Sequence, residues 1–257
     1  MSESNVSIEV TIVRQDSATS QPYEETFQVP YKPRMNVISV LMEIQANPVN
    51  SQGKPVSAPV WDQACLEEVC GSCTVRVNGR VKQACSALID QNTELVGNTR
   101  RLHLAPMSKF PTVRDLIVDR SKMFENLKKI QGWIPIDGTY DLGPGPRMSQ
   151  KEQQLAYHFS QCMSCGCCLE ACPQVNEKNN FIGPAAIGQV RLFNSHPTGA
   201  LNKDDRLEAI SGPDGIASCG NAQNCVQVCP KEIPLTRAIA ELHRDTTVYR
   251  IKKWLGK

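Results

Sequence analysis

Two cysteine-rich stretches constrain this chain more than any other feature. Cys162–Pro173 (CMSCGCCLEACP) and Cys219–Pro230 (CGNAQNCVQVCP) each span twelve residues, align without a gap and end in Cys-Pro. Three of the four repeated cysteines of the first stretch recur in the second, and Ala222 stands where the first stretch has Cys165. Closely spaced cysteine runs that end in Cys-Pro bind iron-sulfur clusters through their thiolates. The chain is therefore expected to fold around inorganic centres as well as around an apolar core.

The missing cysteine makes the two predicted sites unequal. In two-cluster ferredoxins the last cysteine of each run binds the cluster of the other run. One site then has four thiolates and is predicted to bind a 4Fe-4S cluster through Cys162, Cys165, Cys168 and Cys229. The other has three thiolates, from Cys172, Cys219 and Cys225. Because a cubane corner without a ligand is easily lost, we predict a 3Fe-4S cluster at this second site.

Ala222 also allows a second interpretation, a 4Fe-4S cluster whose open iron acts as a Lewis acid in a dehydratase. Such a site needs Arg, Ser and His side chains that anchor the substrate. Residues 220–227 offer Asn, Gln and small residues instead. The sequence therefore favours an electron carrier.

A third cysteine set lies upstream and has the Cys-x4-Cys-x2-Cys spacing of plant-type 2Fe-2S ferredoxins. Its members are Cys65, Cys70, Cys73 and the more distant Cys85. Structural zinc sites usually show two paired Cys-x2-Cys knuckles, which this set lacks. The small residues Gly71 and Ser72 should let backbone N–H groups approach the cluster. The three sets use eleven of the twelve cysteines, and Cys167 remains as a buried thiol outside them.

Composition limits the remaining possibilities. A chain of 257 residues is long enough for two domains. Metal-ligand spacing and a start without the apolar core of a signal peptide favour a reducing, cytosol-facing location. No apolar run approaches the roughly 18 residues of a spanning helix, so membrane contact is expected through partners. The net charge of +2 does not suggest binding to nucleic acid.

The local patterns change character along the chain. Alternating apolar and polar residues predict strands at 7–14, 25–31, 74–77 and 101–105. A helix is predicted from its cap Asn36 to about Asn47, and an Asn-Gly turn follows residue 77. From Pro111 a helical period runs to Ile130, and a Gly- and Pro-rich interaction loop covers 132–148. Further helices are predicted at 181–192 and 235–245, and 249–255 is interpreted as a solvated tail rather than a lipid contact.

These motifs together closely resemble the iron-sulfur subunits of succinate dehydrogenase and fumarate reductase. The resemblance covers nearly the whole chain and is carried by CLEEVCGSC (65–73), CPQVNEKNNFIGPA (172–185), QVRLFNSHPTG (189–199) and CVQVCPKEIP (225–234). It implies an α+β protein. A β-grasp plant-type ferredoxin domain would cover 1–106, and an all-α two-cluster ferredoxin-like domain would cover 107–257.

The resemblance also implies a place in the respiratory chain and the tricarboxylic acid cycle. In that family a separate FAD subunit oxidises succinate, and electrons pass through 2Fe-2S, 4Fe-4S and 3Fe-4S clusters. They then reach quinone at a cytochrome b anchor that carries haem b, on the cytoplasmic face of the membrane. No Gly-x-Gly-x-x-Gly motif occurs in this chain, which agrees with a flavin on a partner. The alternatives are a fumarate reductase running in the opposite direction and a free-standing soluble multi-cluster ferredoxin.

One departure from the family pattern concerns the quinone. Ubiquinone-linked members carry a Trp pair after the Cys-Pro that corresponds to Cys172-Pro173, and a His after the cysteine that corresponds to Cys219. This chain has Gln174-Val175-Asn176 and Gly220 at those places. The sequence therefore resembles the menaquinone-linked bacterial branch.

Overall fold

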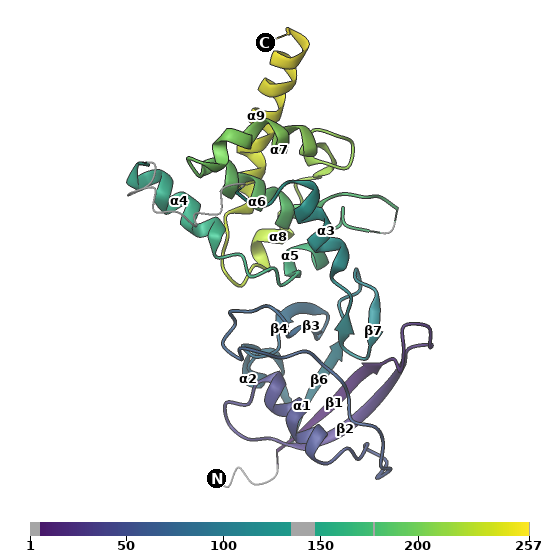
Figure 1. The fold of residues 1–257 in the computed structure, drawn as a ribbon. Helices are drawn as coiled ribbons and strands as arrows, with labels where there is room; N and C mark the ends of the chain where they lie inside the picture. The colour runs from purple at the N-terminus through teal and green to yellow at the C-terminus, as the bar shows by residue number, and fades with distance from the viewer. Residues whose placement is uncertain (1–5, 135–146, 177, 257) are drawn as a thin grey trace, which may run out of the picture. The chain divides into compact units, whose positions relative to one another are not determined.

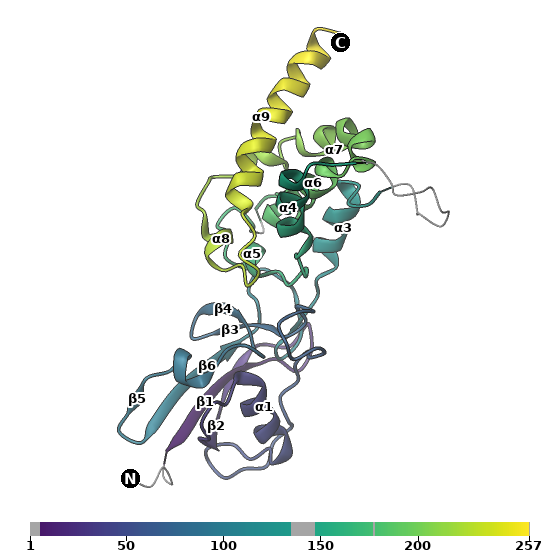
Figure 2. The same cartoon turned by 90° about the vertical axis from the view of Figure 1, so that its left-hand side faces the viewer.

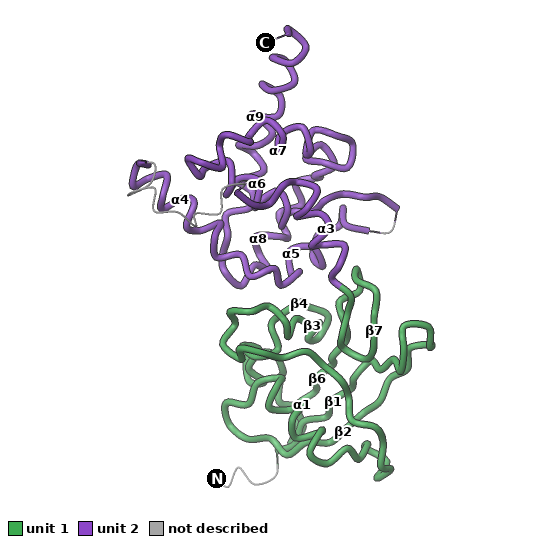
Figure 3. The backbone as a smooth tube through the Cα atoms, in the orientation of Figure 1, with its two compact units in different colours: residues 1–119 green, residues 120–257 purple. Residues whose placement is uncertain are grey.

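The structure, a computed structural model, describes residues 6–134, 147–176 and 178–256. The chain divides into two compact units, residues 1–119 and residues 120–257 (Figure 3). The first unit is built on a β-sheet, and the regular elements of the second are helices (Figure 1). The expected order of a sheet region followed by a helical region is therefore confirmed.

A six-stranded mixed sheet forms the centre of the first unit. Its strands are β1 (Ser7–Arg14), β2 (Tyr23–Pro30), β3 (Thr74–Val77), β4 (Arg80–Gln83), β5 (Leu95–Val96) and β6 (Thr99–Ala105). The main order is β2-β1-β6-β3-β4, with β5 paired to β6. Strands β1 and β6 run parallel, whereas the other pairs are antiparallel. The predicted β1–β2 hairpin and the Asn78-Gly79 turn between β3 and β4 are both confirmed.

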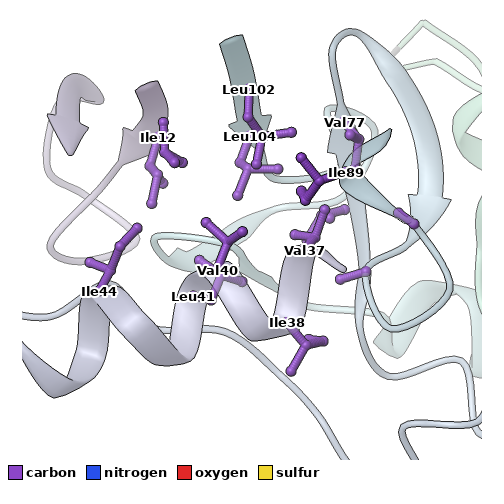
Figure 4. Close-up of a cluster of buried hydrophobic side chains, with 14 of the residues drawn as sticks. Ile12, Val37, Ile38, Val40, Leu41, Ile44, Val77, Ile89, Leu102 and Leu104 are labelled. Atoms are coloured by element: carbon purple, nitrogen blue, oxygen red, sulfur yellow. The ribbon is translucent and has the colours of Figure 1, made fainter. Parts of the chain in front are cut away.

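Helix α1 (Val37–Ala46) packs its apolar face against this sheet. Four of its five buried side chains recur every three or four residues, the spacing that places them on one face: Val37, Val40, Leu41 and Ile44. Val40 and Leu41 point toward the strands that carry Ile12 and Leu104 (Figure 4). The short helix α2 (Ile89–Asn92) adds the fully buried Ile89 to the same core.

The N-cap of α1 also holds the backbone of a predicted cluster ligand. Asn36 Oδ1 accepts a hydrogen bond from the Ser39 N–H at 2.8 Å, and Asn36 Nδ2 donates to the Cys85 carbonyl at 2.8 Å. We expect Asn36→Ala to lower the free energy of unfolding by about 1–2 kcal/mol, measured by urea denaturation. Asn36→Ser keeps a capping oxygen and should lower the free energy of unfolding by less. Equal stability of the Ala variant and the native chain would contradict this role.

The segment after β6 differs from the predicted helix. Residues 112–118 form a small hairpin of β7 (Thr112–Arg114) and β8 (Ile117–Val118), so the helical prediction is wrong there. Asp115, with φ of 46°, makes the turn, and its buried carboxylate accepts N–H groups from distant segments. These contacts stabilise the turn, and they outweigh the preference for a helix that the spacing of apolar residues indicates. Helix α3 (Ser121–Lys129) begins only after the hairpin.

The second unit is an assembly of helices. The elements after α3 are α4 (Gln150–Ser160), α5 (Cys167–Glu170), α6 (Gly183–Ser195), η1 (Gly199–Asn202), α7 (Lys203–Ile210), η2 (Ile216–Ser218), α8 (Asn224–Gln227) and α9 (Leu235–Trp254). Helices α6 and α9 pack together, and Gly188 permits the close approach because a Cβ there would lie 2.8 Å from Leu235 Cδ2. The two predicted helices at 181–192 and 235–245 are thus confirmed as α6 and α9.

Helix α9 is longer than predicted and includes the segment interpreted as a tail. Its last turns extend beyond the other helices of this unit, and Trp254 is 84% exposed (Figure 2). None of the helices that the structure describes combines the length and the apolar character that crossing a membrane requires. Residues 135–146 of the expected interaction loop lie outside the described residues.

Candidate iron-sulfur sites

The first cysteine set begins on the irregular loop between α1 and β3. Cys65 Sγ accepts hydrogen bonds from three backbone N–H groups of this loop, those of Glu67 at 3.4 Å and of Val69 and Cys70 at 3.3 Å each. Such N–H groups stabilise negative charge on a sulfur atom. The loop therefore directs three backbone donors at the Cys65 sulfur.

Left-handed backbone conformations curl this loop around the sulfur atom. Leu66 and Glu68 have φ of 60° and 54°, and Gly71 has φ of 72°. Only the glycine adopts this region without steric cost. Two side-chain-bearing residues in left-handed conformation so close together are typical of a functional loop. Backbone N–H groups thus point at the Cys65 sulfur, and the Ser72 backbone also hydrogen-bonds to the Cys70 sulfur.

The other three cysteines of this set differ in exposure. Cys70 is exposed, and Ser72 Oγ lies 3.1 Å from its Sγ. This hydrogen bond, followed by backbone N–H donors, lowers the pKa of Cys70 to about 6. Cys73 and Cys85 are buried and close enough to hydrogen-bond to each other. Burial is the main reason why the pKa of Cys73 rises to about 11.

The two twelve-residue stretches fold alike. In each, a cysteine loop leads into a single helical turn, α5 or α8. Ser164 and Asn221 occupy equivalent positions, and both have φ of 52°. Gly166 and Gln223 are likewise equivalent, with φ of 86° and 63°, and each precedes its helix. The sequence repeat is thus a repeat of backbone conformation.

The second cysteine set surrounds a cavity. The cavity includes about 480 Å³ of space, part of it open solvent, and four of the residues that line it are Cys162, Cys165, Cys168 and Cys229. Phe159 and Ile233 contribute apolar walls. Burial raises the pKa of the Cys168 thiol well above its ordinary value, and the charges of the other three thiols raise it further. Cys229, from the second stretch, therefore lies with the thiols of the first.

Cys167 is 1% exposed, as expected for a buried thiol, but it also contacts a predicted ligand. Its thiol hydrogen-bonds to Cys165, and this bond is the main reason why the pKa of Cys165 falls to about 7. The positive charge of Arg120 acts in the same direction. Sequence spacing could not indicate this contact, because Cys167 is extra to every ligand pattern.

In the third cysteine set, a cysteine of the first stretch joins two cysteines of the second. Burial raises the pKa of Cys225 to about 11, and the nearby charges of Cys172 and then Cys219 raise it further. Cys172, from the first stretch, is thus close to the thiols of the second. Ala222 is exposed and brings no donor atom.

The donor atoms fit iron-sulfur clusters. In residues 6–134, 147–176 and 178–256, no three His, Cys, Asp or Glu side chains lie close enough to share one metal ion. A cluster needs a wider arrangement, because its thiolates bind separate iron atoms that sulfides bridge. All three sets offer only sulfur, the donor that iron-sulfur clusters select. A sheet unit with one such set and a helical unit with two define an iron-sulfur electron-transfer protein.

Comparison with known proteins identifies the family. Residues 9–125 match the 2Fe-2S iron-sulfur cluster binding domain family, and residues 158–233 match the 4Fe-4S dicluster domain family. The chain is 57% identical to the succinate dehydrogenase iron-sulfur subunit of Bacillus subtilis over 249 residues, which cover 97% of this chain and 96% of that protein. It is 29% identical to the fumarate reductase iron-sulfur subunit of Wolinella succinogenes over 230 residues, or 89% and 91% of the two chains.

A solved structure shares the fold. A chain of the Mycobacterium smegmatis Sdh1 complex in the apo form aligns with a TM-score of 0.74 at 23% identity, covering 94% of this chain and 96% of that one. The chain belongs to the iron-sulfur subunits of the succinate dehydrogenase and fumarate reductase family. Its function is electron transfer within that family of oxidoreductases.

Proposed function

We propose that this chain conducts electrons from a FAD-containing flavoprotein subunit to quinone at a cytochrome b membrane anchor that carries haem b. The 2Fe-2S ligands are Cys65, Cys70, Cys73 and Cys85; the 4Fe-4S ligands are Cys162, Cys165, Cys168 and Cys229; the 3Fe-4S ligands are Cys172, Cys219 and Cys225. When bound, such clusters carry single electrons. The cysteines bind the three clusters, and substrate oxidation takes place on the flavoprotein.

The observation that carries this proposal is the exchange of the Cys-Pro cysteines between the two stretches. Cys229 interacts with Cys162 and Cys168, whereas Cys172 interacts with Cys225. A protein that bound one zinc ion per stretch would have no need for this exchange. Two clusters that share their last ligands require it.

The loop that holds Cys65 and Cys70 is suited to contact with the flavoprotein. Leu66 and Val69 on this loop are 48% and 59% exposed, although both are large and apolar. Exposed apolar side chains beside an electron carrier are typical of docking surfaces. We assign this role to the domain of residues 1–106, as a β-grasp plant-type ferredoxin domain. The domain of residues 107–257 then faces the membrane anchor.

The surroundings of the third site favour menaquinone as the acceptor. A Cβ at Gly220 would lie 2.7 Å from Gln174 Nε2, so the Gln174 amide occupies the space into which a side chain at 220 would project. A quinone pocket of the ubiquinone type would need larger side chains at these positions. We therefore propose that the quinone binds on the cytochrome b anchor. The anchor holds this peripheral subunit at the cytoplasmic face of the membrane.

The test is purification of the native complex, followed by iron analysis and EPR during a succinate titration. We expect co-elution with a flavoprotein and a haem protein, about nine irons per chain (two, four and three) and a trinuclear signal in the oxidised state. A free monomer that exchanges electrons with many reductases would contradict the complex. Zinc in place of iron would contradict the cluster assignment.

A further inference from the structure

A buried chain of hydrogen bonds runs beside Cys73, outside the cysteine ligands themselves. Gln83 on β4 and Thr74 on β3 are each 2% exposed, and Cys73 is 4% exposed. Cys73 Sγ lies 3.7 Å from Gln83 Oε1, Gln83 Nε2 donates to Thr74 Oγ1 at 2.8 Å, and the Thr74 hydroxyl donates to the Gly71 carbonyl at 2.9 Å. A glutamine this deeply buried costs free energy unless its amide is hydrogen-bonded.

The direction of these bonds depends on the state of the sulfur. With Cys73 as a thiol, the S–H group donates to Gln83 Oε1. Iron binds the thiolate, so the thiol proton is lost when a cluster is inserted. The Cys73 sulfur then only accepts hydrogen bonds, and a carbonyl oxygen facing it would bring two acceptors together in a buried place.

A half-turn of the Gln83 amide resolves this conflict. It exchanges the positions of Oε1 and Nε2, which have nearly the same shape. Nε2 then donates to the Cys73 thiolate, and the Thr74 hydroxyl can donate to Oε1 instead of to Gly71. Both polar atoms of the amide then face a partner, Nε2 the Cys73 sulfur and Oε1 the Thr74 hydroxyl, and the positions of the heavy atoms are unchanged.

We propose that Gln83 is a tuning residue of the 2Fe-2S cluster, whose side-chain N–H donates to the Cys73 ligand and raises the reduction potential of the cluster. The inference rests on the proposed function, in which Cys73 is a ligand. Reduction adds one electron and hence one negative charge, and a donor to the ligand sulfur stabilises the more negative state. No proton moves and no bond to iron is made or broken in this step.

The test is Gln83→Met in the purified complex, with the 2Fe-2S cluster followed by EPR during a redox titration. Methionine has a similar length and fills the site without an N–H donor. We expect the ratio of reduced to oxidised cluster at a fixed potential to fall about tenfold, equivalent to a midpoint about 59 mV lower for one electron. A higher midpoint would mean that Oε1 faces the sulfur, and an unchanged midpoint would mean that no contact exists; either result would overturn the proposal.

Matched variants separate this effect from general damage. Thr74→Val removes the hydroxyl that orients the amide and should lower the midpoint by a smaller amount. Gln91→Met changes an exposed glutamine on α2 and should leave the midpoint unchanged. Loss of the 2Fe-2S signal from the native complex would count against the proposed function itself, whereas a normal signal with an unshifted Gln83→Met midpoint would count only against Gln83.

A second measurement uses the native protein and so does not depend on whether a variant folds. Native complex labelled with nitrogen-15 only at glutamine side-chain amides should show a nitrogen-15 coupling in pulsed EPR of the reduced 2Fe-2S cluster. Absence of this coupling would overturn the proposal, whatever the stability of Gln83→Met.

Discussion

Replacing Ala222 with cysteine is expected to convert the proposed trinuclear site into a 4Fe-4S site. The variant should bind about ten irons per chain instead of about nine, and the trinuclear EPR signal of the oxidised protein should disappear. The backbone already suits a ligand there, because Asn221 and Gln223 repeat the left-handed conformations of Ser164 and Gly166 on either side of Cys165. Iron analysis and low-temperature EPR of the intact complex measure both effects.

Two further variants control this experiment. Ala222→Ser offers no thiolate and should keep about nine irons. Ala217→Cys adds an exposed cysteine outside the repeat and should also leave the trinuclear signal in place. An Ala222→Cys protein that folds normally and keeps both its iron content and its trinuclear signal would show that Ala222 is not the vacant ligand position. We also expect the proposed electron transfer from the 4Fe-4S site to the converted site to slow, because the converted cluster has a different potential.

The grouping of the thiols was largely predictable because its signal is local and chemical. Cysteine spacing grouped the thiols, and the structure brings Cys229 and Cys172 to the opposite stretches as that spacing predicted. The elements of the first unit were predictable for a similar reason. The cap at Asn36 and the Asn78-Gly79 turn depend on a few adjacent residues, and each forms where it was predicted.

Features that depend on distant contacts were not predictable in this way. Leu66 and Glu68 adopt left-handed conformations that nothing in their side chains favours. Gln83 looks like an ordinary polar strand residue until the fold places it beside Cys73. The turn at Asp115 was predicted as helix because the apolar period continues through it. In each case the deciding partner lies elsewhere in the sequence.

Removing the Asp115 carboxylate is expected to destabilise the first unit by about 3–5 kcal/mol. Asp115 and Arg14 are both fully buried, and Arg14 Nε donates to Asp115 Oδ1 at 2.9 Å. The carboxylate also accepts the N–H groups of Gln15 at 3.1 Å and Val60 at 2.9 Å. Asp115→Ala would leave these donors buried without their acceptor. Urea denaturation of the first unit measures the loss.

An exposed ion pair supplies the control. Lys32 and Glu43 also form a salt bridge, but their side chains are 62% and 40% exposed. Pairs of this kind contribute at most about 1 kcal/mol, so Lys32→Ala should change the urea midpoint only slightly. If Asp115→Ala and Lys32→Ala lowered the free energy of unfolding equally, burial of the Arg14–Asp115 pair would not contribute to stability.

A double-mutant cycle then separates the pair from its surroundings. Burial opposes the charge of Arg14, but its hydrogen bond to Asp115 and the charge of Asp115 outweigh this, so the pKa of Arg14 lies above its ordinary value. The double variant Arg14→Met, Asp115→Ala should therefore lose less free energy of unfolding than the two single variants lose in sum, by about 1–3 kcal/mol. Purely additive losses would contradict the coupling.

The Arg14–Asp115 pair also holds the loop that leads to Cys65, because Arg14 bonds to Ser57 and Asp115 bonds to Val60. The single variants should consequently also retain less of the 2Fe-2S EPR signal on warming than the native complex does.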